Sequence, residues 1–179
     1  MPSNHVMDIA AVCINYYHDE QRHDGRKEIR YKRLQRILYY VQAQFLVEMG
    51  RPCFVGRIER GEDGPVIPTV ADFYSIYGCC DIGTPLNGFQ LVSQIDTILI
   101  EKICKASMSL SREEMIEKIR REAPWIKAEK DGEPITDESI FTYFSNHPEE
   151  LLVGVKTADT PSRIPWLSAV IGKLIAVQH

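Results

Sequence analysis

Apolar residues repeat at intervals of three and four positions over one long stretch of the chain, from Tyr31 to Met49. This spacing places them on one face of an α-helix about 28 Å long, roughly the width of a small domain. Gly50 and Pro52 follow, and both are typical of a helix end. We therefore expect a central helix on which the rest of the chain packs. Its apolar face is formed by Leu34, Leu38, Val41, Phe45 and Met49.

Five shorter stretches have the same helical periodicity and predict further helices. They cover about residues 6–17, 70–77, 93–106, 111–122 and 136–146. Residues able to cap a helix precede each of them: Ser3 or Asn4, Thr69, Ser93, Ser111 and Thr136. Ser111 with Glu114 forms a capping box at the start of the helix at 111–122. Ala123-Pro124-Trp125 is expected to stop this helix.

Between residues 53 and 67, short extended pieces flank the turn sequence Gly-Glu-Asp-Gly-Pro. Gly61 and Gly64 permit positive φ, and Pro65 disfavours the helical conformation of Gly64. The turn lacks the lysine and the serine or threonine of a phosphate-binding loop. The expected fold class is therefore mainly α, with a single helical domain around one long central helix and a small β-hairpin-like element near 53–67.

The chain after about residue 148 has a different pattern. Leu151, Val153 and Val155 alternate with other residues and predict a short strand. Residues 165–177 are apolar almost throughout, but the stretch is too short to cross a membrane. It forms either a buried closing helix or a surface for a partner. We expect residues 1–148 to form one domain and residues 149–179 to form an extension packed on it.

Composition and charge narrow the range of functions. The chain has 179 residues and a net charge of -4, which disfavours general attraction to nucleic acids or anionic membranes. Its start lacks the pattern of a secretory signal, and no apolar run is long enough to cross a bilayer. The five cysteines have neither zinc-site nor disulfide-framework spacing, so reduced thiols in a cytoplasmic protein are expected.

No set of residues in the sequence forms a recognisable catalytic or cofactor motif. His18 and His23, each followed by an aspartate, could suggest metal ligands, but a solvated polar loop is the favoured interpretation. We therefore expect neither an enzyme nor a protein with a bound metal or cofactor.

The segment from Arg26 to Arg36 is strongly basic, with six basic residues and one acidic residue. A solvated polar face is one interpretation of this patch. The alternative is a docking surface for an acidic partner or for phosphates.

Several short motifs occur together in one order along the chain. Residues 33–42 read R-L-Q-R-I-L-Y-Y-V-Q, residues 50–54 read G-R-P-C-F, and Ile58-Glu59 and Gly64-Pro65-Val66 follow. Pro124-Trp125 and the sequence I-T-D-E-S-I at 135–140 complete the set. Over about residues 6–146 the chain thereby resembles the Panacea domain, the family of SocA-like and phage-associated GepA-like proteins. It departs from the family at Arg60-Gly61, where members have Ala-Trp.

The resemblance implies a mostly helical antitoxin that binds and neutralises a cognate toxin by direct contact. It also implies that the central helix and the Gly-Pro-Val turn form the binding surface, and arginine and tyrosine are common in interface hot spots. Core packing remains an alternative for Tyr39 and Tyr40, as does a purely structural turn for Gly64-Pro65. The candidate partner-binding residues are Arg33, Gln35, Arg36, Tyr39, Tyr40, Gln42, Gly64, Pro65, Val66 and Trp125.

Two further functions stay open. The protein could be a proteolytic adaptor that delivers a bound partner to a cytoplasmic protease through its apolar C-terminal segment. It could instead be a nucleic-acid-binding regulator that uses the basic patch at 26–36, but the net charge ranks this third. The expected partner is thus a toxin protein, with a protease as a second partner in the adaptor case, no membrane, and an open oligomeric state.

Overall fold

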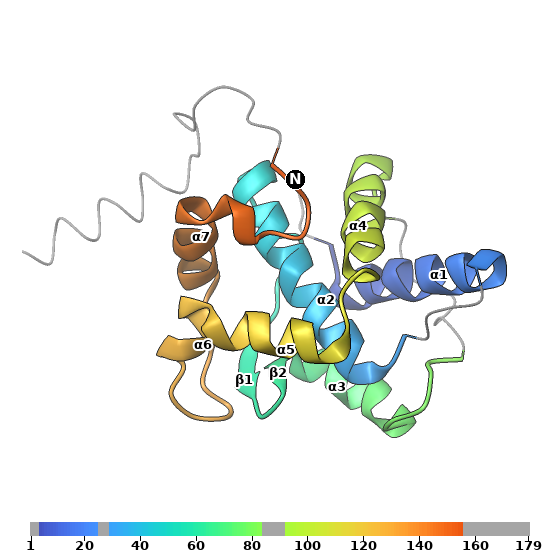
Figure 1. The fold of residues 1–179 in the computed structure, drawn as a ribbon, viewed down its shortest axis with the longest axis horizontal. Helices are drawn as coiled ribbons and strands as arrows, with labels where there is room; N and C mark the ends of the chain where they lie inside the picture. The colour runs from blue at the N-terminus through green and yellow to red at the C-terminus, as the bar shows by residue number, and fades with distance from the viewer. Residues whose placement is uncertain (1–3, 25–28, 84–91, 156–179) are drawn as a thin grey trace, which may run out of the picture.

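Helix α2 (Tyr31–Gln44) runs through the middle of the molecule in the computed structural model, which describes residues 4–24, 29–83 and 92–155 (Figure 1). A π-helical turn, η1 (Phe45–Met49), continues it. Gly50 then ends it with a left-handed φ of 64°, as expected. Every residue of α2 from Leu34 onward is buried. The prediction of a central helix from Tyr31 to Met49 is confirmed, but Met49, which was expected on its apolar face, is exposed.

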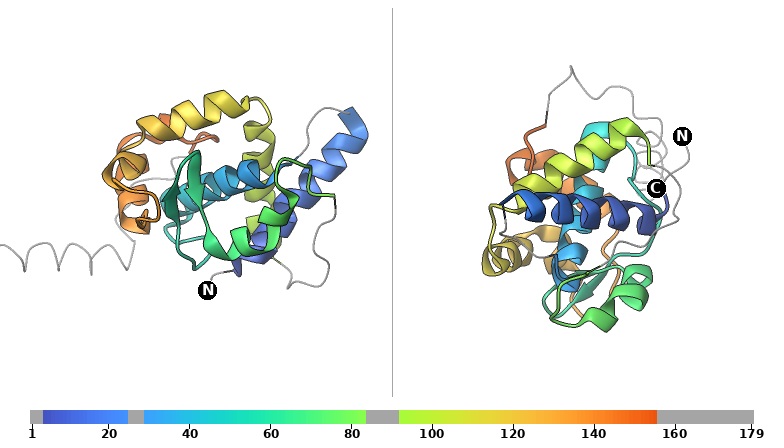
Figure 2. Two further views of the ribbon diagram at one scale, coloured as in Figure 1. Left: turned by 90° about the horizontal axis from the view of Figure 1, so that it is seen from below. Right: turned by 90° about the vertical axis from the view of Figure 1, so that its right-hand side faces the viewer.

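The other helices pack around α2. Helices α1 (Val6–Asp24) and α4 (Gln94–Ser107) lie on one side of it, and α6 (Ala123–Lys127) and α7 (Asp137–Asn146) lie on the other (Figures 1 and 2). Helix α5 (Arg112–Arg121) precedes α6. The described part of the chain also contains three shorter helical pieces: α3 (Pro68–Tyr74), η2 (Ser75–Tyr77) and η3 (Pro148–Glu150). One core unites these elements, so the chain is a mainly helical single domain.

The expected β-hairpin is present. Strands β1 (Glu59–Gly61) and β2 (Gly64–Val66) pair antiparallel, with Glu59 opposite Val66 and Gly61 opposite Gly64. Strand β2 contacts both α2 and α5, so the hairpin turn lies between these helices. The segment before α7 supports the other edge of the hairpin, because the backbone N–H of Arg60 donates to the carbonyl of Glu133 at 2.8 Å.

Three predicted helix starts are confirmed, because each has the expected capping hydrogen bond. The Ser93 hydroxyl accepts from the N–H of Asp96, and the Thr136 hydroxyl accepts from the N–H of Ser139. Ser111 and Glu114 form both bonds of a capping box. Local side-chain chemistry therefore sets where α4, α5 and α7 begin.

Two helix boundaries predicted from the sequence are wrong. Helix α1 continues past Tyr17 to Asp24, through a segment expected to be a polar loop, because residues such as Glu20 and Gln21 favour a helix. Helix α3 begins at Pro68 with Ile67 as its N-cap, in place of Thr69. Proline is well suited to the first helical position, where no N–H is needed.

Two further expectations need correction. Pro124 does not simply stop α5 but lies in the first turn of a new short helix, α6, where proline is tolerated. Residues 151–155 form bends and irregular chain in place of the predicted strand. Leu151 is buried, and the amide of Gln44 donates to the carbonyl of Val153 at 3.1 Å, so this segment is held by α2. The apolar stretch at 165–177 lies outside the described residues.

Within residues 4–24, 29–83 and 92–155, no helix combines the length and apolar character that a membrane span needs.

Candidate partner-binding site

Gln42, one of the predicted partner-binding residues, is fully buried in α2. Its Oε1 accepts from the backbone N–H groups of Cys53 at 3.0 Å and Phe54 at 3.2 Å. Its Nε2 donates to the carbonyl of Phe54 at 3.1 Å and to Oδ1 of Asp137 at 2.9 Å. A single amide thus joins α2 to the chain before β1 and to the start of α7. Gln42 holds the fold together and offers no surface to a partner.

Gln35 is a second buried amide of α2, and it binds the backbone of the chain that follows the hairpin. Its Oε1 accepts from the N–H of Ile67 at 2.8 Å, and its Nε2 lies 3.5 Å from the carbonyl of the same residue. Ile67 is the N-cap of α3 and directly follows β2. Gln35 therefore fixes the end of the hairpin against α2.

Tyr39 and Tyr40 are buried and share one acceptor. The Tyr39 hydroxyl donates to Oε2 of Glu122 at 2.8 Å, and the Tyr40 hydroxyl donates to Oε1 at 2.7 Å. Glu122 is itself only 1% exposed, with Nζ of Lys118 at 3.9 Å. Burial raises the pKa of Glu122 to about 7, although the two hydroxyls and Lys118 act in the opposite direction. Both tyrosines therefore pack in the core, the alternative to contact with a partner, and they join α2 to the end of α5.

Arg33 also acts inside the fold. Its Nε donates to the Tyr17 hydroxyl at 3.1 Å, while Nη2 donates to the carbonyls of Ser107 at 2.6 Å and Leu110 at 2.8 Å. These bonds connect α2 to α1 and to the loop between α4 and α5. The guanidinium is committed to backbone and hydroxyl acceptors within the domain.

Trp125 is buried beneath Arg60. The guanidinium of Arg60 lies 4.5 Å from the centre of the indole ring and donates to the carbonyls of Trp125 and Ala128. Arg60 is one of the two residues at which the chain departs from the Panacea pattern. In this protein it covers the tryptophan, so Trp125 supports the hairpin from inside.

Arg36 joins α2 to the hairpin turn at Asp63 and Gly64. Nε and Nη2 of Arg36 donate to the carbonyl of Asp63 at 3.1 and 2.9 Å. Gly64 has a φ of 136°, and a Cβ at this position would lie 3.2 Å from Nε of Arg36. Both the backbone conformation and the close approach of the guanidinium therefore require glycine here.

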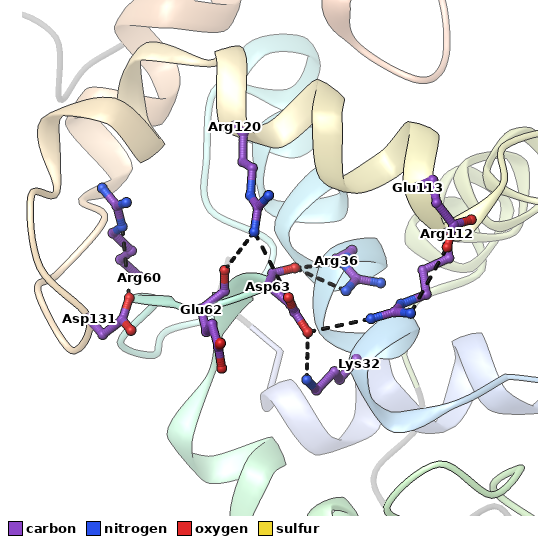
Figure 3. Close-up of polar contacts among 9 residues, drawn as sticks. All are labelled: Lys32, Arg36, Arg60, Glu62, Asp63, Arg112, Glu113, Arg120 and Asp131. Carbon is purple, nitrogen blue, oxygen red and sulfur yellow. Dashed lines mark hydrogen bonds and ion pairs between the residues drawn. The ribbon is translucent and has the colours of Figure 1, made fainter.

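The carboxylate of Asp63 is the centre of a cluster of cations (Figure 3). Nζ of Lys32 lies 2.7 Å from it, Nη2 of Arg112 lies 3.5 Å away, and Nη2 of Arg120 lies 3.9 Å away. The hydrogen bond from Lys32 and the nearby arginines lower the pKa of Asp63. All three cationic side chains are more than half exposed. Lys32, Asp63, Arg112 and Arg120 are called the turn surface below.

A hollow of about 80 Å³ opens beside the turn surface. Helix α2 forms one side of it and the hairpin forms the other. The hollow is lined by Tyr31, Lys32, Gln35, Arg36, Glu62, Asp63, Gly64, Pro65 and Val66.

The predicted site is thus split in two. Five of the candidates line the hollow: Gln35, Arg36, Gly64, Pro65 and Val66. The other five do not, and their contacts lie within the domain: Arg33, Tyr39, Tyr40, Gln42 and Trp125. The contacts of these five residues hold segments of the domain together.

Three residues of the turn surface were not among the sequence candidates: Asp63, Arg112 and Arg120. Lys32 belonged to the predicted basic patch, of which Arg26 and Lys27 lie outside the described residues. Arg112 and Arg120 are eight positions apart on α5, a spacing that puts both on one helix face. This spacing could have indicated a shared basic helix face. The contact of both arginines with Asp63 depends on how α5 packs against β2, which the sequence does not show.

The histidines of the possible metal site were also located. His18 lies in α1, and its Nε2 is 2.7 Å from the carbonyl of Ile82. In the described part of the chain, no three histidine, cysteine, aspartate or glutamate residues are grouped in a way that could hold a metal ion.

Comparison with models of known protein families, with curated proteins and with solved structures finds no match to this chain. The resemblance to the Panacea domain therefore stands on the motifs of the sequence itself.

Proposed function

We propose that this protein is an antitoxin-type binding protein, which neutralises a cognate toxin by direct contact through the turn surface and the adjoining hollow. The observation that carries the proposal is the rigid support of the turn surface. Buried bonds from Gln35 and from the Tyr39–Tyr40–Glu122 group hold the hairpin and α5 on α2. A preorganised surface of this kind loses little conformational entropy when a partner binds.

The residue types of the turn surface also favour a protein partner. Lys32, Arg112 and Arg120 expose their charges, whereas the apolar wall of the hollow comes from Pro65 and Val66. A pocket with an arginine at its base and a polar rim is the usual arrangement around an interface hot spot. The motif set that resembles the Panacea domain supports a toxin as the partner.

A nucleic-acid-binding regulator is the competing function for the same surface. It is less favoured because Asp63, Glu62 and Glu113 lie among the cations, and a phosphate backbone would meet their negative charges. The adaptor function depends on the stretch at 165–177 and remains a prediction from the sequence. In each case we propose action in the cytoplasm, where exposed thiols such as those of Cys79 and Cys80 stay reduced.

Co-expression with each flanking open reading frame tests the proposal. We expect one neighbour to stop growth when expressed alone, to be harmless together with this protein, and to co-purify with it in a stable complex. If no neighbour is toxic and the purified protein binds DNA or RNA with an affinity that falls steeply with salt, the nucleic-acid function replaces the proposal.

A further inference from the structure

Arg36 carries a positive charge that the described part of the chain does not pair with a carboxylate. The residue is 2% exposed, and its two hydrogen bonds both go to one backbone carbonyl, that of Asp63. Its third nitrogen, Nη1, has no hydrogen-bond partner among the described residues, and Arg36 is one of the residues that line the hollow. A buried cation without a counter-ion is unfavourable, because it has lost its hydration without gaining an opposite charge.

Charges of both signs surround Arg36. Burial and the neighbouring Arg112 lower the pKa of its guanidinium to about 10, although the carboxylates of Asp63 and Glu113 act in the opposite direction. Figure 3 shows Lys32, Arg112 and Arg120 grouped around the single carboxylate of Asp63, which lies within 4 Å of all three cations. The hollow itself is lined by two cations, Lys32 and Arg36, and by two carboxylates, Glu62 and Asp63. The excess of positive charge comes from Arg112 and Arg120, which lie beside the Asp63 carboxylate. Such a site attracts an anion.

We infer that an acidic side chain of the partner protein inserts its carboxylate into the hollow and accepts a hydrogen bond from Nη1 of Arg36, with Lys32 and Arg112 at the rim. The inference rests on the proposed partner-binding function and names the group that the site recognises. The hollow of about 80 Å³ is well above the volume needed for one water molecule, so a carboxylate group fits. An arginine–carboxylate bond of this kind is charge-assisted and stronger than a neutral hydrogen bond.

A carboxylate on a protein fits this site better than a nucleic-acid phosphate does. The hollow presents one buried donor group, whereas binding to a phosphate backbone uses a row of cations. Glu62 and Asp63 both line the hollow, so an anion bound there lies near two carboxylates, and a single carboxylate group meets less repulsion than a row of phosphates does.

The first test is a nuclear magnetic resonance titration of the full chain with the blocked tripeptide acetyl-Gly-Glu-Gly-amide. The Nε–H signal of Arg36 reports on this one guanidinium. We expect it to shift and saturate with the glutamate peptide, and not to respond to the matched glutamine peptide. If the Arg36 signal does not move, or moves equally with both peptides, the inference is wrong.

Variants of the rim sharpen the test. Lys32→Ala/Arg112→Ala should weaken glutamate-peptide binding at least fivefold, because two exposed cations are lost. Asp63→Asn keeps the carbonyl that holds Arg36 but removes the competing charge, so binding should tighten about three- to fivefold. Arg121→Ala on the same helix should change nothing, because the Arg121 side chain donates to the carbonyl of Glu117 and does not line the hollow. Weaker binding in the Asp63→Asn variant would overturn the inference.

A competition experiment separates the two possible anion sources. A ten-residue polyglutamate peptide should displace the tripeptide more strongly than a thymidine decanucleotide does, and the reverse order assigns the site to nucleic acid. The tripeptide titration can fail while a toxic neighbour still co-purifies, which would leave the proposed function standing. Conversely, saturable binding at Arg36 without any toxic neighbour would retain the carboxylate site and remove the antitoxin function.

Discussion

On α2, Tyr39 and Tyr40 donate to a buried carboxylate, whereas nearer the start of the same helix Lys32 faces solvent beside Asp63. Both regions are polar, but the first is closed and fully paired, and the second is open with cations in excess. Buried polar groups are kept where each finds a partner, and such a network specifies how helices pack. Exposed ion pairs contribute little to stability. The contrast indicates a structural role for the buried network and is consistent with the binding role that we propose for the turn surface.

The largest effect is expected from Glu122→Ala. The substitution removes the acceptor of two buried tyrosine hydroxyls and should lower the free energy of unfolding by about 3–5 kcal/mol. Urea denaturation measures the loss, and Glu117→Ala, an exposed position on α5, is the matched control with a change below about 0.5 kcal/mol. A Glu122→Ala protein as stable as the control would contradict a structural role for this network.

The same carboxylate predicts how stability depends on pH. The pKa of Glu122 is raised from its ordinary 4.5 to about 7, so between these values the folded protein binds more protons than the unfolded chain. Its stabilising contribution is therefore complete below about pH 4.5 and is lost as pH rises through 7, a change of about 2–3 kcal/mol. Glu122→Gln should flatten this part of the stability profile, and an unchanged profile would remove Glu122 as its source.

The buried amide of Gln42 is expected to have an effect of about 2–3 kcal/mol. In Gln42→Ala, two backbone N–H groups and one carbonyl near Phe54 lose their partner. Gln94→Ala, at an exposed position on α4, is the control. Thermal unfolding compares the two variants. Equal midpoints would show that the hydrogen bonds between Gln42 and the backbone at Cys53 and Phe54 do not contribute to stability.

Gly64 lies where the buried part of α2 contacts the hairpin that carries the turn surface. Gly64→Ala combines an unfavourable φ of 136° with a close contact to Arg36, and it should cost about 1–3 kcal/mol. Gly83→Ala, where a Cβ meets nothing within 4 Å, should be nearly neutral. If the two variants are equally stable, the hairpin turn tolerates a side chain and Gly64 does not fix Arg36.

The smallest effect on stability is expected at the turn surface itself. Lys32→Ala and Arg112→Ala should each change the free energy of unfolding by no more than about 0.5 kcal/mol, because both pairs with Asp63 are exposed. Urea denaturation checks this. A loss as large as that of Gln42→Ala would mean that the turn surface belongs to the structural network.

Local signals in the sequence predicted much of the fold. The Ser111–Glu114 capping box, the periodicity of α2 and the small hairpin depend on neighbouring residues only, and all three are confirmed. The turn expected at Gly64-Pro65 lies instead at Glu62-Asp63, and Gly64 and Pro65 belong to strand β2. The strand predicted at 151–155 failed because its alternating pattern had no neighbouring strand to pair with, a matter of tertiary structure.

The candidate site was predicted less completely. The sequence pattern marked Gln42 as notable but could not reveal that Phe54 and Asp137 meet its amide from distant positions. Likewise, nothing local to Arg120 indicates that it lies beside Asp63. Polar residues on the central helix can be buried or exposed, and the packing of the hairpin and α5 decides which.

The most direct test of the central claim is rescue from the cognate toxin by a charge-deleted variant, Lys32→Ala/Arg112→Ala/Arg120→Ala. We predict that this variant keeps nearly the stability of the unmodified chain but neither rescues growth nor co-purifies with the toxin, whereas Arg121→Ala does both. If the folded triple variant rescues and binds as well as the Arg121→Ala control, the turn surface is not the binding site.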